Sequence, residues 1–372
     1  MKEPALPIAV GIITALTLGH LNPLNQCFVI VAIAVVFYEQ LLLLLAAIAV
    51  ALVYQTPVLE TLKEGAFFSV TTSWLHDWIG ILYDKQLAPF FSTLFLGESP
   101  GFYLSYTFQS VGLSHLLAIS GFHFQALIAT ADLFISKIAK ERSYLIALIL
   151  IACGYIAIVQ LSPSVLRSFI ALQIALFAPL KERIYSAKNT LYFSFIVIFF
   201  LMPDRICGVG CSLSFLATFG ILHYAGQIRR FLETLWVTES VYPEKIRLNY
   251  VKKIFSQIVS LNIAVMLTTV PFILLKTGQY PLISILMNLF MPTLLLPALF
   301  LFLLSLPLPF IAPINSWYTK KILSILEIVP RSFTFEWICP TSLTPLLETI
   351  LVAILLFPLL RSCVKSTKWG LI

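Results

Sequence analysis

Long apolar runs, separated by short polar connectors, dominate the pattern along this chain. From residue 111 onward the runs cover about 111–135, 143–161, 164–180, 189–202, 211–228, 256–275, 282–306 and 345–361, with a short one near 310–328. Shorter runs at 7–21, 26–38 and 40–55 predict two or three further helices. Because a helix needs about 20 apolar residues to cross a bilayer, the pattern predicts an all-α, polytopic integral membrane protein with about 8–11 transmembrane helices.

Residues 57–96 follow a different pattern, in which aromatic and aliphatic side chains alternate with charged ones. Trp74 and Trp78, for example, flank His76 and Asp77. Such aromatic amphipathic segments lie at the membrane interface. The sequence therefore predicts four regions, which are N-terminal transmembrane helices over 1–56, an interfacial amphipathic segment over 57–96, a transmembrane core over 97–306, and a C-terminal transmembrane segment with a short tail over 307–372.

The composition agrees with this class, since 59% of the 372 residues are hydrophobic and 11% are charged. Soluble domains have about 25% charged residues, so a large soluble catalytic domain is excluded. The formal net charge of +7 is expected to orient the connectors, because basic loops of membrane proteins stay in the cytoplasm. The basic connectors 137–142, 181–188 and 229–253 are therefore expected in the cytoplasm, and 97–112 and 203–210 outside.

The densest polar cluster inside an apolar run is the stretch Gly112 to His123, which reads GLSHLLAISGFH. If 111–135 is one helix, it carries two polar stripes, one with Gly112, His115, His123 and Thr130, the other with Ser114, Gly121, Gln125 and Asp132. Polar residues in a bilayer face protein or water, so these stripes are candidates for a transport pathway. Helix packing through small residues explains them equally well.

Arg167 is a second candidate, because it follows a Ser-Pro-Ser sequence by one turn of an expected helix. Its guanidinium suits bidentate phosphate contact, and snorkelling to the membrane surface is the alternative. Ser214 lies on a small-residue stripe near the external end of another span. Pro292 and Pro297 predict a broken helix over 282–306, which is tolerated only against protein or a water-filled cavity.

Few residues suggest covalent chemistry. Ser120 with His223 on a later span would suit an intramembrane serine protease, but the residue before Ile119 is alanine where the usual G-x-S-G has glycine. The six cysteines include no C-x-x-C pair, so we expect no catalytic residue, no metal and no cofactor.

Three stretches, in this order, resemble motifs of the ComEC family of DNA-uptake channel proteins, also called competence proteins. They are Leu96-Gly97-Glu98 followed by the Gly112 to His123 stretch, then Ser164 to Ser168 (SVLRS), then Ser212 to Gly220 (SLSFLATFG). The motifs TVP at 269–271 and NLFMP at 288–292 continue the match, which covers about residues 90–300. Three positions depart from the family pattern, since Glu98 stands for Asp, Ser168 for Ala and Ser212 for Gln.

The resemblance implies a bacterial inner-membrane channel, with 97–306 as its core, that carries single-stranded DNA into the cytoplasm. The polar positions described above give the candidate residues of its transport pathway, which are Gly112, Ser114, His115, Ser120, Gly121, His123, Arg167 and Ser214. The expected partners are single-stranded DNA, the lipid bilayer, a separate DNA receptor and a cytoplasmic motor ATPase or helicase, because the chain has no P-loop. A homo-oligomer is left open.

The chain resembles the membrane core of the family alone. An external OB-like domain and a C-terminal metallo-β-lactamase-like nuclease domain, common in the family, find no counterpart in the sequence. Separate OB-like and nuclease proteins are therefore further candidate partners. The alternative to transport is a reduced, non-transporting membrane assembly protein.

Overall fold

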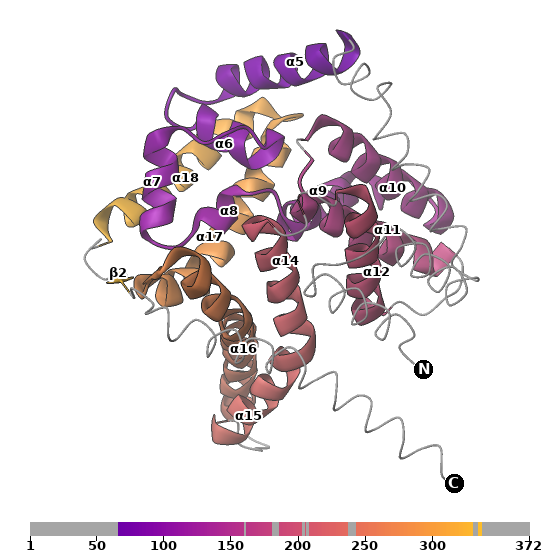
Figure 1. Cartoon of the computed structure of the whole chain (residues 1–372). Coiled ribbons are helices and arrows are strands. Elements are labelled where there is room, and N and C mark those ends of the chain that lie inside the picture. Colours follow the sequence, from indigo (N-terminus) through magenta and orange to yellow (C-terminus); the bar gives the residue numbers. More distant parts are fainter. Residues whose placement is uncertain are drawn as a thin grey trace, which may run out of the picture. The chain divides into compact units, whose positions relative to one another are not determined.

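The structure, a computed structural model, is dominated by α-helices (Figure 1). It describes residues 66–159, 161–180, 186–202, 205, 208–236, 243–329 and 334–336. The helices up to residue 201 are α5 (Ala66–Leu82), α6 (Ala88–Leu96), α7 (Phe102–Ser110), α8 (Ser114–Leu117), α9 (Gly121–Ile135), α10 (Glu141–Ile158), α11 (Pro163–Leu180) and α12 (Ala187–Leu201). The later elements are α14 (Val209–Gly220), the π-helix η2 (Ile221–Ala225), α15 (Gly226–Trp236), α16 (Pro243–Thr277), β1 (Gln279–Pro281), α17 (Ile283–Ser305), the 3-10 helix η3 (Pro309–Ile311), α18 (Ala312–Ile328) and β2 (Thr334–Glu336).

The described residues contain five helices long and apolar enough to cross a membrane, at Glu141–Ile158, Pro163–Leu180, Val209–Trp236, Asn249–Thr277 and Ile283–Ser305. Two shorter apolar helices lie at Gly121–Ile135 and Ala187–Phe199. These helices confirm the predicted class, an all-α multi-pass membrane protein. The spans expected before residue 56 and at 345–361 lie outside the described residues.

The continuous helix predicted over 111–135 is wrong. Gly112 has a φ of 72°, which stops α7, and the short helix α8 is followed by a second break before α9 begins at Gly121. The two polar stripes assumed one unbroken helical period, so they do not exist as predicted. Hydropathy missed the breaks because the apolar residues between the polar ones keep the average over the whole run high.

The broken helix predicted over 282–306 is also wrong, since α17 runs without interruption from Ile283 to Ser305. Pro292 and Pro297 each remove one backbone N–H, but their fixed φ is compatible with a helix. Membrane helices tolerate such prolines where neighbouring groups satisfy the freed carbonyls. Pro271 likewise lies inside the continuous helix α16.

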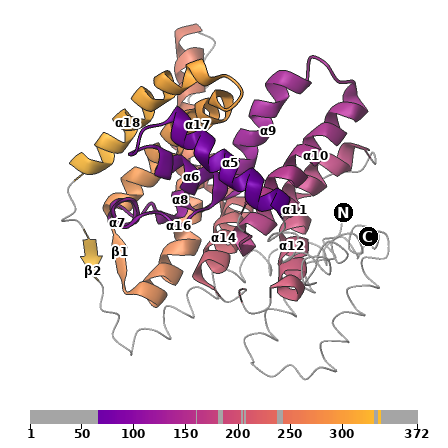
Figure 2. The same ribbon diagram turned by 90° about the horizontal axis from the view of Figure 1, so that it is seen from above.

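The chain divides into two compact units, and neither is one continuous stretch. Unit 1 contains the described residues up to Gly101, together with Leu117–Cys211 and Leu296–Lys321. Within it α9, α10, α11 and α12 pack in succession, and α9 and α10 lie side by side in Figure 2. The predicted regional boundaries at 56, 96 and 306 stay a proposal.

The core of unit 1 is aromatic. The rings of Phe91 and Phe302 stack with centroids 4.6 Å apart, and Tyr155 donates a hydrogen bond to the carbonyl of Phe95 at 3.2 Å. All the residues of α6 from Phe90 to Leu96 are buried. Within the expected interfacial segment, therefore, α6 belongs to the core of the unit, while α5 exposes Trp74 and Ile81.

Unit 2 contains Phe102–Leu116, Ser212–Leu295 and the described residues after Lys321. Its long helix α16 packs against both η2 and α15. The strands β1 and β2 pair antiparallel, with Tyr280 opposite Phe335. This two-stranded ribbon was not expected from the sequence, because three-residue strands are too short to produce an alternating pattern.

Candidate functional site

The second half of the first motif builds the start of α9 in unit 1. Ser120 is the N-cap residue, in an extended conformation with φ −142°, and its backbone N–H donates to Nδ1 of His123 at 3.0 Å. This bond belongs to a capping box, in which the N-cap and the third helical residue bond reciprocally. Ser120 and His123 therefore have a local structural role, because they cap the N-terminus of α9.

His123 has a further feature, because its side chain is 2% exposed. Since Nδ1 accepts a hydrogen bond, the neutral ring carries its proton on Nε2. Nε2 is buried and has no hydrogen-bond partner among the described residues. Buried donors are seldom left unpaired, so Nε2 of His123 is an unusual buried polar atom inside unit 1.

The second motif begins helix α11 and lies directly against the first. Ser164 donates from its hydroxyl to the carbonyl of Ile119 at 3.5 Å. A Cβ placed on Gly121 would stand 3.5 Å from Oγ of Ser168, which is ordinary van der Waals contact. The two motifs are about 40 residues apart in sequence. The hydroxyl groups of Ser164 and Ser168, on one face of α11, nevertheless pack against the backbone of Ile119 and Gly121.

Arg167 lies on α11 between these serines and is half-buried. Its Nη2 donates to Oγ of Ser168 at 3.5 Å, and Ser168 in turn donates to the carbonyl of Ser164 at 2.8 Å. Unit 1 therefore brings Ser120, Gly121, His123 and Arg167 into one region, and their role as a transport site stays a prediction. Sequence reasoning missed Ser164 and Ser168 as members, although their spacing of four residues around Arg167 places them on one helix face.

The other predicted site residues belong to unit 2. Gly112 lies against the end of β1 and the start of α17, where a Cβ would stand 2.9 Å from Cγ of Pro281 and 2.5 Å from Cβ of Ser284. Its positive φ and this close approach explain the glycine. Ser114 and His115 follow it on α8, and Ser214 lies on α14, where its carbonyl accepts from Thr218 at 3.0 Å.

No cluster of three His, Cys, Asp or Glu side chains within the described residues could hold a metal ion. The protease alternative required Ser120 and His223, which fall in different units. Within unit 2, Nδ1 of His223 donates to the carbonyl of Phe219 at 3.0 Å and its ring stacks on Phe219. His223 therefore has a structural role in the π-helix η2.

Comparison with known proteins gives the same family as the motifs. The family model described as "Competence protein" matches residues 99–362. ComE operon protein 3 of Bacillus subtilis (strain 168) is 28% identical over 189 residues, which are 50% of this chain and 21% of that protein. The match thus spans about a fifth of the relative's length, and no solved structure matches the chain. Because the family model covers most of the chain, the protein belongs to the competence protein family, of the ComEC type.

Proposed function

We propose that this protein acts in DNA uptake during natural competence, and that its helical core carries single-stranded DNA across the inner membrane into the cytoplasm. Membership of the competence protein family supports the role in uptake. The five long apolar helices support a multi-pass membrane position for that role. The conduit itself, its direction and its partners are the proposal.

The observation that best supports a conduit is the position of Arg167 in unit 1. Arg167 lies on a membrane helix among Ser164 and Ser168, next to the break that holds Ser120 and His123. A charged group in a membrane helix is costly unless it faces protein or water, and it commonly marks the path of an ion or substrate. A planar guanidinium with neighbouring hydroxyls suits a phosphodiester, which cannot cross hydrocarbon unaided.

Single-stranded DNA is held mainly through its backbone charge, with stacking on aromatic rings. We propose that Arg167 supplies the fixed charge and that the polar groups of both motifs supply a wet lining. The chain would perform no covalent step. A separate receptor would deliver the DNA, and a separate ATPase or helicase would supply the work.

The test is uptake of labelled DNA in a deletion strain that is complemented with Arg167 variants. If the charge contacts phosphate, Arg167→Lys should keep part of the uptake and Arg167→Gln should lose most of it, with normal membrane abundance for both. Arg142→Gln, which removes an exposed cation at the start of α10, is the matched control and should keep full uptake.

Abundance separates the other outcomes. Loss of Arg167→Gln from the membrane would indicate a bracing role in the fold. Normal uptake by Arg167→Gln at normal abundance would remove this residue from the site. Normal uptake in the deletion strain itself would instead favour the non-transporting assembly role.

A further inference from the structure

The helix α15 carries an outer face that no other described element buries. Ile228, Leu232 and Trp236 are partly covered on the side of α16, whereas Phe231 and Leu235 are each 63% exposed. These two residues are four apart, so they share one face of the helix. None of the residues of α15 is fully buried. The apolar stripe of α15 is thus wider than the part that α16 covers.

The lengths of the two helices place this face at the membrane surface. The spans Val209–Trp236 and Asn249–Thr277 have 28 and 29 residues, so each is about 42 Å long or slightly longer at about 1.5 Å per residue. The hydrocarbon core is about 30 Å thick, so roughly eight residues of each helix extend beyond it. Because α15 and the start of α16 pack together and carry the charges, the excess lies at this shared end.

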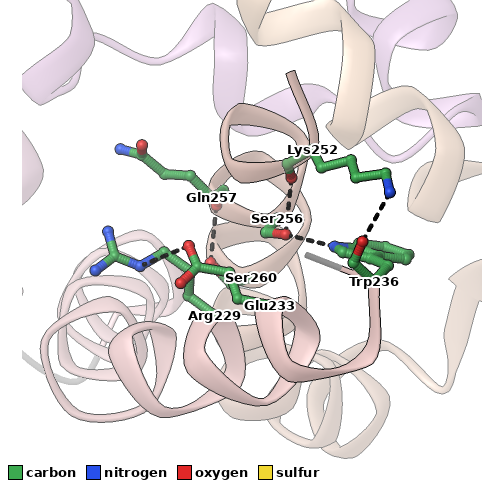
Figure 3. Close-up of polar contacts among 7 residues, drawn as sticks. All are labelled: Arg229, Glu233, Trp236, Lys252, Ser256, Gln257 and Ser260. Carbon is green, nitrogen blue, oxygen red and sulfur yellow. Dashed lines mark hydrogen bonds and ion pairs between the residues drawn. The ribbon is translucent and has the colours of Figure 1, made fainter. Parts of the chain in front are cut away.

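The packing between the two helices is fixed by polar contacts (Figure 3). Nζ of Lys252 donates to the carbonyl of Trp236 at 2.8 Å, and Nε1 of Trp236 donates to Oγ of Ser256 at 2.8 Å. Trp236 is the last residue of α15, so the ammonium group satisfies a free carbonyl at the negative end of the helix dipole. The indole is thereby held in place at the level where tryptophan prefers to lie in a membrane.

The remaining cations of this region are more available. Arg229 pairs loosely with Glu233, with Nε and Oε1 3.7 Å apart (Figure 3). Arg230 and Lys253 are exposed, and neither has an acceptor among the described residues. Two cations are therefore engaged within the fold, and two project from it beside exposed apolar side chains.

We propose that this α15–α16 basic surface, formed by Arg229, Arg230, Phe231, Leu235, Lys252 and Lys253, binds the phosphate headgroups of anionic phospholipids. Arg230 and Lys253 would contact the headgroups, while Phe231 and Leu235 would enter the boundary with the acyl chains. Basic residues next to exposed apolar ones at the end of a span are the arrangement that anionic lipid recognition requires. This inference does not depend on DNA transport.

Charge alone would also suit a single-stranded nucleic acid, and the apolar side chains decide between the two. Leu235, Val251 and Ile254 are 63%, 57% and 43% exposed beside the cations. Nucleic acid would stack on aromatic rings and leave these aliphatic groups in water. A lipid headgroup layer covers both kinds of side chain.

The test measures lipid binding to the purified full chain in detergent by native mass spectrometry, with dioleoyl-phosphatidylglycerol and dioleoyl-phosphatidylcholine as probes. The wild type should bind phosphatidylglycerol more tightly. The double variant Arg230→Gln, Lys253→Gln should weaken that binding by roughly fivefold for each charge removed, and leave phosphatidylcholine unchanged. The charge-preserving pair Arg230→Lys, Lys253→Arg should keep the preference.

The matched control is Lys137→Gln, Arg142→Gln, which removes one exposed cation from the connector after α9 and another from the start of α10. An equal loss in this control would assign the preference to net charge and overturn the proposal. Equal affinity of the wild type for both lipids would overturn it as well. The proposal would also be overturned if a single-stranded oligothymidylate bound through Arg230 and Lys253 while the affinity for lipid did not change in their variants. If the double variant does not fold, Lys253→Gln alone carries the same test.

Discussion

The hydroxyl of Thr268 donates a hydrogen bond to the carbonyl of Leu216 at 2.8 Å, where α16 crosses α14. Gly220 lies one turn further along α14, and a Cβ placed on it would overlap the carbonyl oxygen of Ala264 and come within 2.7 Å of Oγ1 of Thr268. Small residues permit such close crossings between membrane helices. The glycine that ends the third family motif is therefore explained by packing within unit 2.

We predict that Gly220→Ala destabilises the protein by about 1–3 kcal/mol, because backbone lies where the new methyl group must go. Gly210→Ala is the matched control in the same helix, since a Cβ there meets nothing within 4 Å. It should be neutral or slightly stabilising through helix propensity. Thermal unfolding in detergent measures both, and equal midpoints for the two variants would show that the crossing is looser than described.

Gly112 gives a second steric prediction. Its φ of 72° costs a residue with a side chain about 1–2 kcal/mol, and the contact with Cβ of Ser284 adds to this. Gly112→Ala should therefore lower the unfolding midpoint by several degrees. Gly154→Ala in α10, where a Cβ meets nothing within 4 Å, should leave the midpoint unchanged or raise it slightly through helix propensity. A wild-type midpoint in Gly112→Ala would contradict the tight turn before α8.

A buried polar network inside unit 1 should be sensitive to the loss of a single hydroxyl. Tyr83 places its hydroxyl 2.8 Å from both Oγ of Ser305 and the side-chain amide of Asn315, and both partners are fully buried. Tyr83→Phe should cost about 1–3 kcal/mol, because it removes one hydrogen-bond partner from each of the buried side chains of Ser305 and Asn315. Tyr103→Phe, which removes an exposed hydroxyl bonded to Glu327, should cost less. Unfolding midpoints in detergent compare them, and a neutral Tyr83→Phe would argue against the network.

The ion pair between Asp84 and Lys320 predicts a pH effect. The ammonium of Lys320, together with the backbone N–H groups of Gln86 and Leu87, lowers the pKa of Asp84 below its ordinary value of 3.8. A lowered pKa in the folded state stabilises the protein above the unfolded value, and this contribution is lost as pH falls through the folded value. The pair is about half exposed, so it is worth less than about 1 kcal/mol.

Asp84→Asn should therefore unfold at a slightly lower temperature than the wild type at pH 6, and the difference should vanish at pH values well below 3.8. Asp77→Asn, at an exposed position of α5 without an ion-pair partner among the described residues, is the control. A difference that grows on acidification would reverse the sign and refute the assignment.

The orientation in the membrane is tested by labelling single cysteines with an impermeant reagent. We expect a cysteine at position 101 to react from outside and one at position 245 to react only after the membrane is opened, because basic connectors stay in the cytoplasm. Reaction at 245 without reaction at 101 would invert the topology and the direction of transport proposed above.

The sequence by itself determined the class and the family of this protein. Burial in a bilayer depends on the transfer free energy of each side chain, which is a local property, so hydropathy located α10, α11, α12 and α17 near their observed bounds. The motifs that suggested the family are stretches of contiguous residues, and the match of the family model confirmed the family.

Only the tertiary structure decided where helices break, which small residues are required and what lies inside. Ser284 leaves no room for a side chain at Gly112, and Ala264 leaves none at Gly220. Both neighbours lie dozens of residues away in the sequence. The contact of Ser164 with Ile119, which joins two motifs, likewise depends on how α11 folds back. Hydropathy could not foresee these features, because close approach and left-handed backbone are set by distant neighbours and carry no signature in the apolar period.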